Sequence, residues 1–275
     1  MEIDYTKVAA DAIKEIAKDA YNDTAHPAAQ NVGGAIGTLT GFFNHVVLFP
    51  LKKLNIEYEQ KAKAWQHDME RKYNAIPEEN RVEPQLNIVG PTLESMKYNI
   101  MDDDLAEMFS NLLVSDMDNT TQGLCTPSFV KTIEQLTPND AAAFKVIFTK
   151  HQNGEPLPIC RIKYVQQDDP DYALSSESIP AYYSNLIIPH MNGKSISKSL
   201  QNLDRLGLID IITDLQYYRD NTFYDAMLKS TNVSQTIQIG KNVLGKDFRA
   251  ELAGKGLIEV NDFGCDFAKV CLRNS

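Results

Sequence analysis

Three acidic residues of the chain, Glu83, Asp116 and Asp118, could do hydrolytic chemistry if the fold brought them together in a pocket. The sequence contains neither a GxSxG nor an HExxH motif, and it offers no nucleophile with a recognisable base beside it. We therefore expect a protein that is not an enzyme, and we keep a hydrolase as an alternative that requires these three carboxylates to converge.

Asp116 and Asp118 also open the segment DMDNTTQG, which resembles the start of a calcium-binding loop. In such a loop, Thr121 stands where glycine is needed for the sharp turn, and Pro127 stands where a bidentate glutamate is needed. The segment is therefore predicted to form a turn that closes a helix rather than a metal site.

Two segments carry parts of a phosphate-binding loop. The run from Gly240 to Asp247 has the glycine and lysine spacing, but Asp247 replaces the serine or threonine that would hold magnesium. The run that ends at Ser195 has the correct last residues, but Ile188 occupies the position of the first glycine. Neither segment predicts nucleotide hydrolysis.

Composition limits the function further. The 275 residues carry a formal net charge of −10, which argues against a protein whose affinity comes mainly from contacts with phosphates. The N-terminal residues lack the positive charge and apolar run of a secretory signal, so we expect a cytoplasmic protein. The four cysteines form no zinc-binding or disulfide pattern, and we expect neither a metal nor a cofactor; they are Cys125, Cys160, Cys265 and Cys271.

The segment 25–51 contains no Asp, Glu, Lys or Arg, and within it Gly33, Gly37 and Gly41 recur at every fourth position. On a helix, this spacing would place three residues without side chains on one face, where another helix could approach closely. Its polar residues, which include Asn44 and His45, favour a buried helix or helical hairpin in a soluble bundle over a membrane span. A membrane contact made only on activation stays open as an alternative.

The middle of the chain predicts a series of helices. The segment 51–76 has apolar residues at steps of three and four, and a further short helix is expected to begin at Pro91. The acidic run 102–104 is then expected to cap a helix whose apolar stripe includes Leu105, Phe109 and Leu112.

The blocks IPEEN, VEPQLNIVGPTLESMKY, DDLAEMFSNLLVSDMD and PSFVKTIEQLTPNDA, in this order, resemble the abortive infection alpha (Abi-alpha) family of bacteria. The resemblance covers roughly Leu51 to the C-terminus. It implies a role in defence against phage. The family supplies no accepted catalytic mechanism, so the resemblance assigns no active-site residue.

The pattern of the chain changes after residue 157. A strand at PICRIKYV, a helical stretch over 182–190, a helix at SISKSLQNLDRL and strands at GLIDII and GLIEV follow in order, and this order is typical of a winged-helix module. We expect the chain to end in a turn and a short terminal segment.

The helix at SISKSLQNLDRL would be the recognition helix if this module bound nucleic acid. This helix carries few positive charges, and Asp204 partly offsets them. Contact with a protein is therefore the preferred interpretation, and a nucleic-acid-binding regulator is the alternative. The residues that would contact nucleic acid are Lys194, Ser195, Lys198, Gln201 and Arg205.

Taken together, the sequence predicts a mainly α fold with a small β component, built from N-terminal helices (1–76), a central helical core (77–137) and a winged-helix-like module (138–275). We expect an abortive-infection protein that acts through protein contacts, with membrane association on activation as the alternative that stays open. Its partners would be a phage or host protein that acts as trigger, further copies of the chain, or a membrane. A purely structural interaction protein is the remaining alternative.

Overall fold

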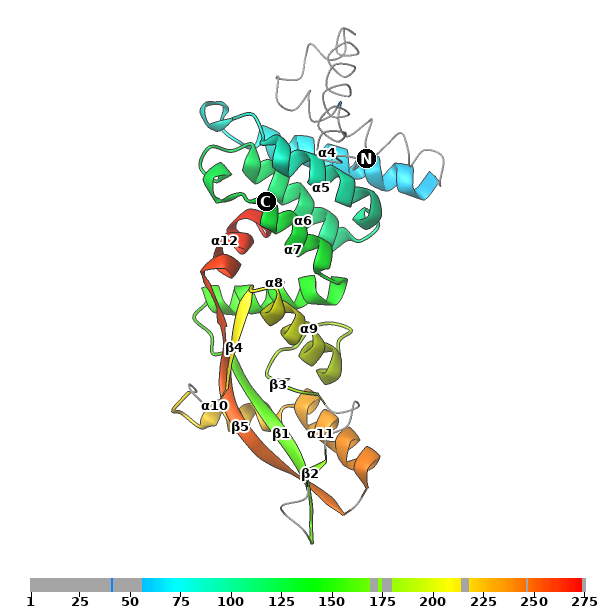
Figure 1. Cartoon of the computed structure of the whole chain (residues 1–275), viewed down its shortest axis with the longest axis vertical. Helices are drawn as coiled ribbons and strands as arrows, with labels where there is room; N and C mark the ends of the chain where they lie inside the picture. The colour runs from blue at the N-terminus through cyan, green and yellow to red at the C-terminus, as the bar shows by residue number, and fades with distance from the viewer. Residues whose placement is uncertain are drawn as a thin grey trace, which may run out of the picture. The chain divides into compact units, whose positions relative to one another are not determined.

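The computed structural model describes residues 41, 56–168, 173–174, 180–213, 218–245 and 247–273. These residues form a mainly α fold with a small antiparallel sheet, which confirms the predicted fold class (Figure 1). Internal contacts divide the chain into two compact units. Unit 1 comprises Met1–Gln135 together with Lys269–Ser275, and unit 2 comprises Leu136–Ala268.

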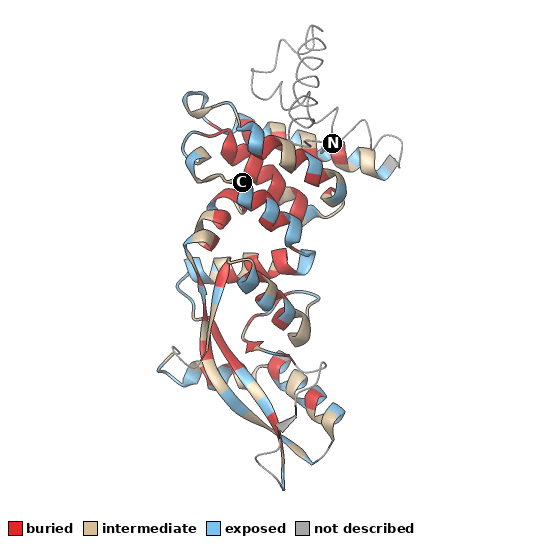
Figure 2. Ribbon diagram, in the orientation of Figure 1, coloured by how far each residue is buried: buried red, intermediate tan, exposed pale blue. Residues whose placement is uncertain are grey.

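Four helices make up most of the described part of unit 1, and α6 is buried along most of its length (Figure 2). As predicted, Asp102 caps α6 by accepting a hydrogen bond from the backbone nitrogen of Leu105. The helices are α4 (Ile56–Asn74), α5 (Leu86–Asn99), α6 (Asp103–Asp116) and α7 (Pro127–Gln135).

Helix α4 packs through the apolar stripe that its sequence predicts. Ala62, Trp65, Met69 and Tyr73 are all buried, and the Trp65 indole nitrogen donates a hydrogen bond of 3.0 Å to the carbonyl of Ala106 in α6. This bond satisfies the one polar atom of a large buried aromatic side chain. The stripe therefore fixes how α4 lies on α6.

The start of α5 differs from the prediction, because the helix begins at Leu86 and contains Pro91 in its interior. A proline in a helix removes one backbone donor. The side chain of Gln85 and the neighbouring loop hold the first turn in place, since Gln85 donates hydrogen bonds to Asp116 from its backbone nitrogen and from its amide. Pro91 therefore lies inside α5 rather than in its first turn, where the sequence analysis had placed it.

Unit 2 contains an antiparallel sheet of order β2-β1-β5-β4, in which β3 also pairs with β1. The predicted strand at PICRIKYV and the predicted pairing of the two later strands are both present. The elements are α8 (Pro138–Gln152), β1 (Pro158–Gln166), β2 (Ala173–Leu174), β3 (Tyr183–Ser184), α9 (Gly193–Arg205), β4 (Ile209–Thr213), α10 (Thr222–Lys229), α11 (Thr231–Leu244), β5 (Phe248–Val260) and most of α12 (Asp262–Cys271), whose last three residues belong to unit 1.

The helical stretch expected over 182–190 is wrong. Tyr183 and Ser184 form β3 and pair with Cys160 and Ile159 of β1. The backbone of His190 then has a φ of 63°, a left-handed conformation that a helix cannot continue through. Tyr183 is buried, and pairing with β1 supplies hydrogen-bond partners for its backbone. This pairing outweighed the helical pattern of the local sequence.

Helices α10 and α11 lie between β4 and β5 in the sequence, and the sequence analysis did not predict them. They pack on one face of the sheet around a cluster of buried side chains. Tyr224 of α10 reaches β5, where its hydroxyl donates a hydrogen bond of 2.8 Å to the Gly256 carbonyl. The buried members of the cluster are Cys160, Tyr183, Tyr224, Met227 and Val233.

The short terminal segment expected after the last strand forms a helix, α12, which the sequence analysis did not predict. The side chain of Asn261 accepts a hydrogen bond of 2.9 Å from the backbone nitrogen of Gly264 and so caps the first turn of the helix. Within unit 2, Phe267 of this helix packs edge-on against Phe144 of α8 with ring centroids 5.6 Å apart. The turn predicted at Asn261–Gly264 is thus the start of a helix.

Candidate functional site

The predicted recognition helix is present as α9, and its two faces differ sharply. Asn192 caps it by accepting a hydrogen bond of 2.9 Å from the backbone nitrogen of Ser195. Ile196, Leu200 and Leu203 are buried on one face. The helix is therefore anchored in unit 2 by an apolar side, and its other side is available for contacts.

That other side carries four of the five candidate residues. Lys194, Lys198, Gln201 and Arg205 follow at steps of four, three and four, which places them on one face of a helix. Lys198, Gln201 and Arg205 are exposed and Lys194 is half-buried. We call these four residues the α9 stripe. The fifth candidate, Ser195, donates its hydroxyl proton to the Asn192 side chain and so belongs to the helix cap.

Neighbouring side chains hold the end of the α9 stripe in place. Arg205 donates two hydrogen bonds, of 3.0 and 2.8 Å, to the amide oxygen of Asn202. The amide nitrogen of Asn202 in turn donates a hydrogen bond of 2.8 Å to Asp140, which also caps α8. Asp204 accepts a hydrogen bond from the backbone of Ile211 in β4. The guanidinium is therefore positioned, and an exposed carboxylate lies one residue from it.

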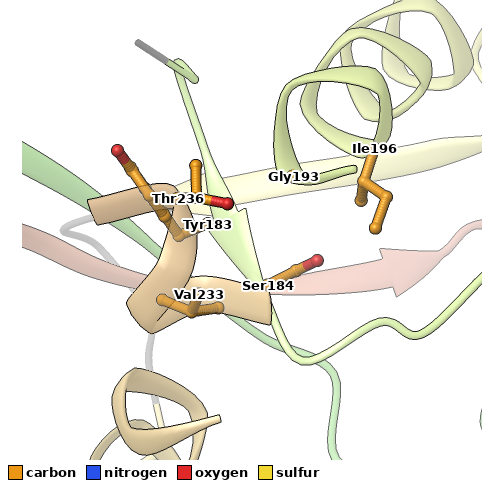
Figure 3. Close-up of a pocket in the computed structure, with 6 residues that line it drawn as sticks. All are labelled: Tyr183, Ser184, Gly193, Ile196, Val233 and Thr236. Atoms are coloured by element: carbon orange, nitrogen blue, oxygen red, sulfur yellow. The ribbon is translucent and has the colours of Figure 1, made fainter. Parts of the chain in front are cut away.

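The other end of α9 packs against α11. A Cβ atom added at Gly193 would lie 2.7 Å from the Thr236 hydroxyl, so the two helices approach closely at this point. The cavity between them has a volume of about 10 Å³, which is room for one water molecule rather than a ligand (Figure 3). Its lining residues are Tyr183, Ser184, Gly193, Ile196, Val233 and Thr236.

This packing bears on nucleic-acid binding. In helix-turn-helix proteins, the N-terminal residues of the recognition helix contact the base edges in the major groove. Here α11 packs against Gly193, the first residue of α9. A groove-binding mode that uses the start of α9 would therefore place the nucleic acid close to α11.

The three acidic residues of the hydrolase alternative are engaged in separate interactions. Glu83 is exposed, and its backbone carbonyl accepts a hydrogen bond from Gln122. Asp116 is fully buried and accepts two hydrogen bonds from Gln85. Among the residues that the structure describes, no group of three or more His, Cys, Asp or Glu side chains is placed to hold a metal ion.

Asp118 accepts hydrogen bonds from the backbone and hydroxyl of Thr120 and forms an ion pair of 2.8 Å with Arg273. These bonds explain why DMDNTTQG forms a turn, as predicted. Burial alone would raise the pKa of Asp118, but the Thr120 hydrogen bonds and Arg273 outweigh it and hold the pKa below its ordinary value. Burial raises the pKa of Asp116, although the hydrogen bonds from Gln85 partly offset this effect.

The glycine candidates fall mostly outside the described residues. Gly33 and Gly37 lie outside them, and Gly41 is helical and half-buried. Across the described ranges, every helix is too short or too polar to cross a membrane.

The phosphate-loop pattern that begins at Gly240 falls on a helix. Gly240 lies inside α11 and is buried, and a Cβ atom there would lie 2.2 Å from the Tyr164 hydroxyl. A helix interior cannot present the consecutive backbone N–H groups that cradle a phosphate, because those groups bond within the helix. The glycine allows close packing instead.

The structure also brings together a pair of residues that the sequence analysis missed. The sulfur of Cys265 in α12 lies 3.8 Å from Nε2 of His151 in α8, although 114 residues separate them in sequence. Spacing could not reveal this pair, because only the packing of α12 on α8 brings the two side chains together.

The described fold is thus that of a mainly α protein whose unit 2 exposes a positively charged helix face. A family model described as "Abortive infection alpha" matches residues 57–271, which are most of the chain. The chain therefore belongs to the abortive infection alpha family, as the sequence blocks indicated, and this family suggests a role related to abortive infection. No curated protein and no solved structure matches the chain.

Proposed function

We propose that this protein defends bacteria against phage by abortive infection, and that it acts in the cytoplasm through protein contacts rather than catalysis. Membership of the family supports the defence role. The α9 stripe would be the surface that binds the partner, a phage or host protein. The order of strands β1, β5 and β4 beside α8 and α9 supports a winged-helix-like interpretation of unit 2.

The observation that carries the choice of protein over nucleic acid is the packing of α11 against the start of α9. Gly193, Lys194 and Ser195 at this end are half-buried, while Lys198, Gln201 and Arg205 further along are exposed. The formal charge of −10 on the chain also argues against affinity that comes mainly from contacts with phosphates.

The chemistry of the α9 stripe indicates the kind of partner surface. Three cations and one amide lie along the exposed face, so a protein segment rich in Asp and Glu would complement them. Arg205 is held by Asn202, so a partner carboxylate would meet a guanidinium whose orientation is already fixed.

Site-specific crosslinking in infected cells tests this proposal. Lys198 is replaced by the photoreactive p-benzoylphenylalanine, and Lys229, an exposed residue of α10, is replaced in a control. We expect a phage-dependent crosslink from position 198 that protease destroys and nuclease leaves intact, with none from position 229. A nuclease-sensitive product would support the regulator alternative, and an adduct of twice the chain mass would identify a second copy. Equal crosslinking from both positions would contradict the proposal.

The charge-free segment 25–51 is the candidate effector. We propose that infection leads to membrane association through the face marked by Gly33, Gly37 and Gly41. Leucine at all three positions would block a close helix approach. The expected result is loss of both membrane recovery and phage protection on fractionation of infected cells, while a control with Ala35→Leu keeps both. Protection that survives in the triple variant would refute this part of the proposal.

A further inference from the structure

Cys265 and His151 form a thiol–imidazole pair that the proposed function does not use. The Cys265 sulfur lies 3.8 Å from His151 Nε2 and 3.9 Å from the carbonyl of Val260. Cys265 is half-buried and His151 is exposed, so small molecules can reach the pair. The histidine ring also stacks on Phe148, with ring centroids 6.2 Å apart, which holds the imidazole beside the thiol.

The thiol is held rigidly in the first turn of α12. Asn261 caps this turn through the Gly264 nitrogen and also donates a hydrogen bond of 3.2 Å to Asp210 of β4. Gly264 packs so closely on the residue before β4 that an added Cβ atom would clash with the Leu208 carbonyl. The helix start therefore cannot shift away from His151 without breaking contacts with the sheet.

The other three cysteines lie in different surroundings. Burial raises the pKa of Cys160 to about 12, and burial followed by the charge of Asp116 raises the pKa of Cys125 to about 12. Burial also raises the pKa of Cys271 well above its ordinary value. At neutral pH these three sulfurs remain protonated, and a protonated thiol is a poor nucleophile.

We propose that Cys265 is a modification site, at which the thiol reacts with low-molecular-weight disulfides and His151 accepts its proton. The Cys265 sulfur attacks one sulfur of the disulfide, so that a new S–S bond forms to the protein and the original S–S bond breaks. The released thiolate takes the proton from His151. The protein sulfur is oxidised and the released thiol is reduced, so no other reactant is needed.

Other charges near the pair act against the thiolate. Asp262 and Asp266 flank Cys265 on α12, and Asp210 lies behind the Asn261 cap. On the α8 side, Lys150 is paired with Glu155 and contributes little net charge. The His151 imidazole is therefore the basic group that lies beside the thiol.

The test treats the folded, full-length protein with glutathione disulfide and locates the adduct by mass spectrometry. We expect modification first at Cys265, its loss in Cys265→Ser, and no change in rate in Cys125→Ser. His151→Phe keeps the stacking on Phe148 and should lower the rate at pH 7 by about tenfold, with the difference disappearing at alkaline pH.

His151→Gln provides a second variant should His151→Phe disturb the packing, which labelling of the buried Cys160 and Cys271 would reveal. Urea-unfolded protein, in which all four cysteines should react alike, shows that protection comes from the fold. Equal labelling of Cys125 in the folded protein, or an unchanged rate and pH profile in both histidine variants, would overturn the proposal.

Discussion

At the scale of single residues, hydrogen bonds hold the segment DMDNTTQG in its turn. Asp116 binds the segment before α5 through Gln85, and Asp118 binds both Thr120 and Arg273. The backbone joins the same two segments, because Val82 donates a hydrogen bond of 3.0 Å to the Met117 carbonyl. Asp116 and Asp118 therefore tie this turn to other segments of unit 1.

Replacing Arg273 with methionine should lower the free energy of unfolding by about 2 kcal/mol at neutral pH, because the buried carboxylate of Asp118 loses a charged hydrogen-bond donor. Chemical denaturation measures the change. Arg71→Met is the matched control: Arg71 forms an exposed ion pair with Asp68, and its loss should cost less than about 0.5 kcal/mol.

The effect of Arg273→Met should also depend on pH. The folded pKa of Asp118 lies below the ordinary value of 3.8, so the folded state binds fewer protons than the unfolded state between the two values. The stabilisation is fully present above 3.8 and is lost as the pH falls through the folded pKa. The difference between wild type and variant should therefore shrink below pH 3.8. A difference that stays constant down to pH 2 would show that lost packing, not charge, causes it.

At the scale of elements, glycines set how closely α11 can approach its neighbours. Gly240 lies against the Tyr164 hydroxyl, which also contacts the Tyr183 hydroxyl at 3.1 Å and the Ile237 carbonyl at 3.3 Å. Helix α11 thus packs against β1 through the buried Tyr164 hydroxyl and through the apolar cluster around Tyr224.

Gly240→Ala should destabilise the protein by about 2 kcal/mol, because the new methyl group would overlap the buried Tyr164 side chain. Alanine normally stabilises a helix interior by about 1 kcal/mol relative to glycine. Gly90→Ala in α5 should show that normal gain, since nothing lies within 4 Å of its added Cβ atom. The free energies of unfolding should move in opposite directions, and a stabilised Gly240→Ala variant would refute the packing described for α11.

Helices that have capping residues or an apolar stripe in their own sequence could be predicted, and elements that lack these features could not. The acids before α6 and the apolar stripe of α4 acted as their sequences indicated. Helices α10 and α11 were not predicted because they contain few apolar anchors such as Met227 and Val233. These side chains pack against residues that are distant in sequence, such as Cys160 of β1. The pair of Cys265 and His151 depends entirely on tertiary packing, which no local pattern encodes.

At the scale of the whole molecule, unit 2 occupies one continuous segment, and unit 1 uses chain from both sides of it. Within unit 1, Asn111 and Ser115 of α6 donate hydrogen bonds of 3.0 Å to the carbonyls of Cys271 and Val270. The residues after unit 2 are thus part of the core of unit 1. The three-part division predicted from sequence stays a prediction beside this arrangement.

Binding of the purified protein to double-stranded DNA should be weak and should not change in Lys198→Glu. The chain carries a net charge of −10, and only three cations lie on the α9 stripe. Titration at two salt concentrations measures this directly. Tight binding that weakens steeply with salt, and is lost in Lys198→Glu but retained in Lys229→Glu, would instead assign α9 to nucleic acid.

The central claim is that the α9 stripe is the surface through which this family member defends the cell. The most direct measurement is phage plating on bacteria that express wild type, a Lys194→Glu and Lys198→Glu double variant, or the Lys229→Glu control, with equal amounts of folded protein. We predict that the double variant plates like cells without the protein, because reversed charge repels an acidic partner, while the control protects like wild type. Full protection by the double variant would contradict the claim.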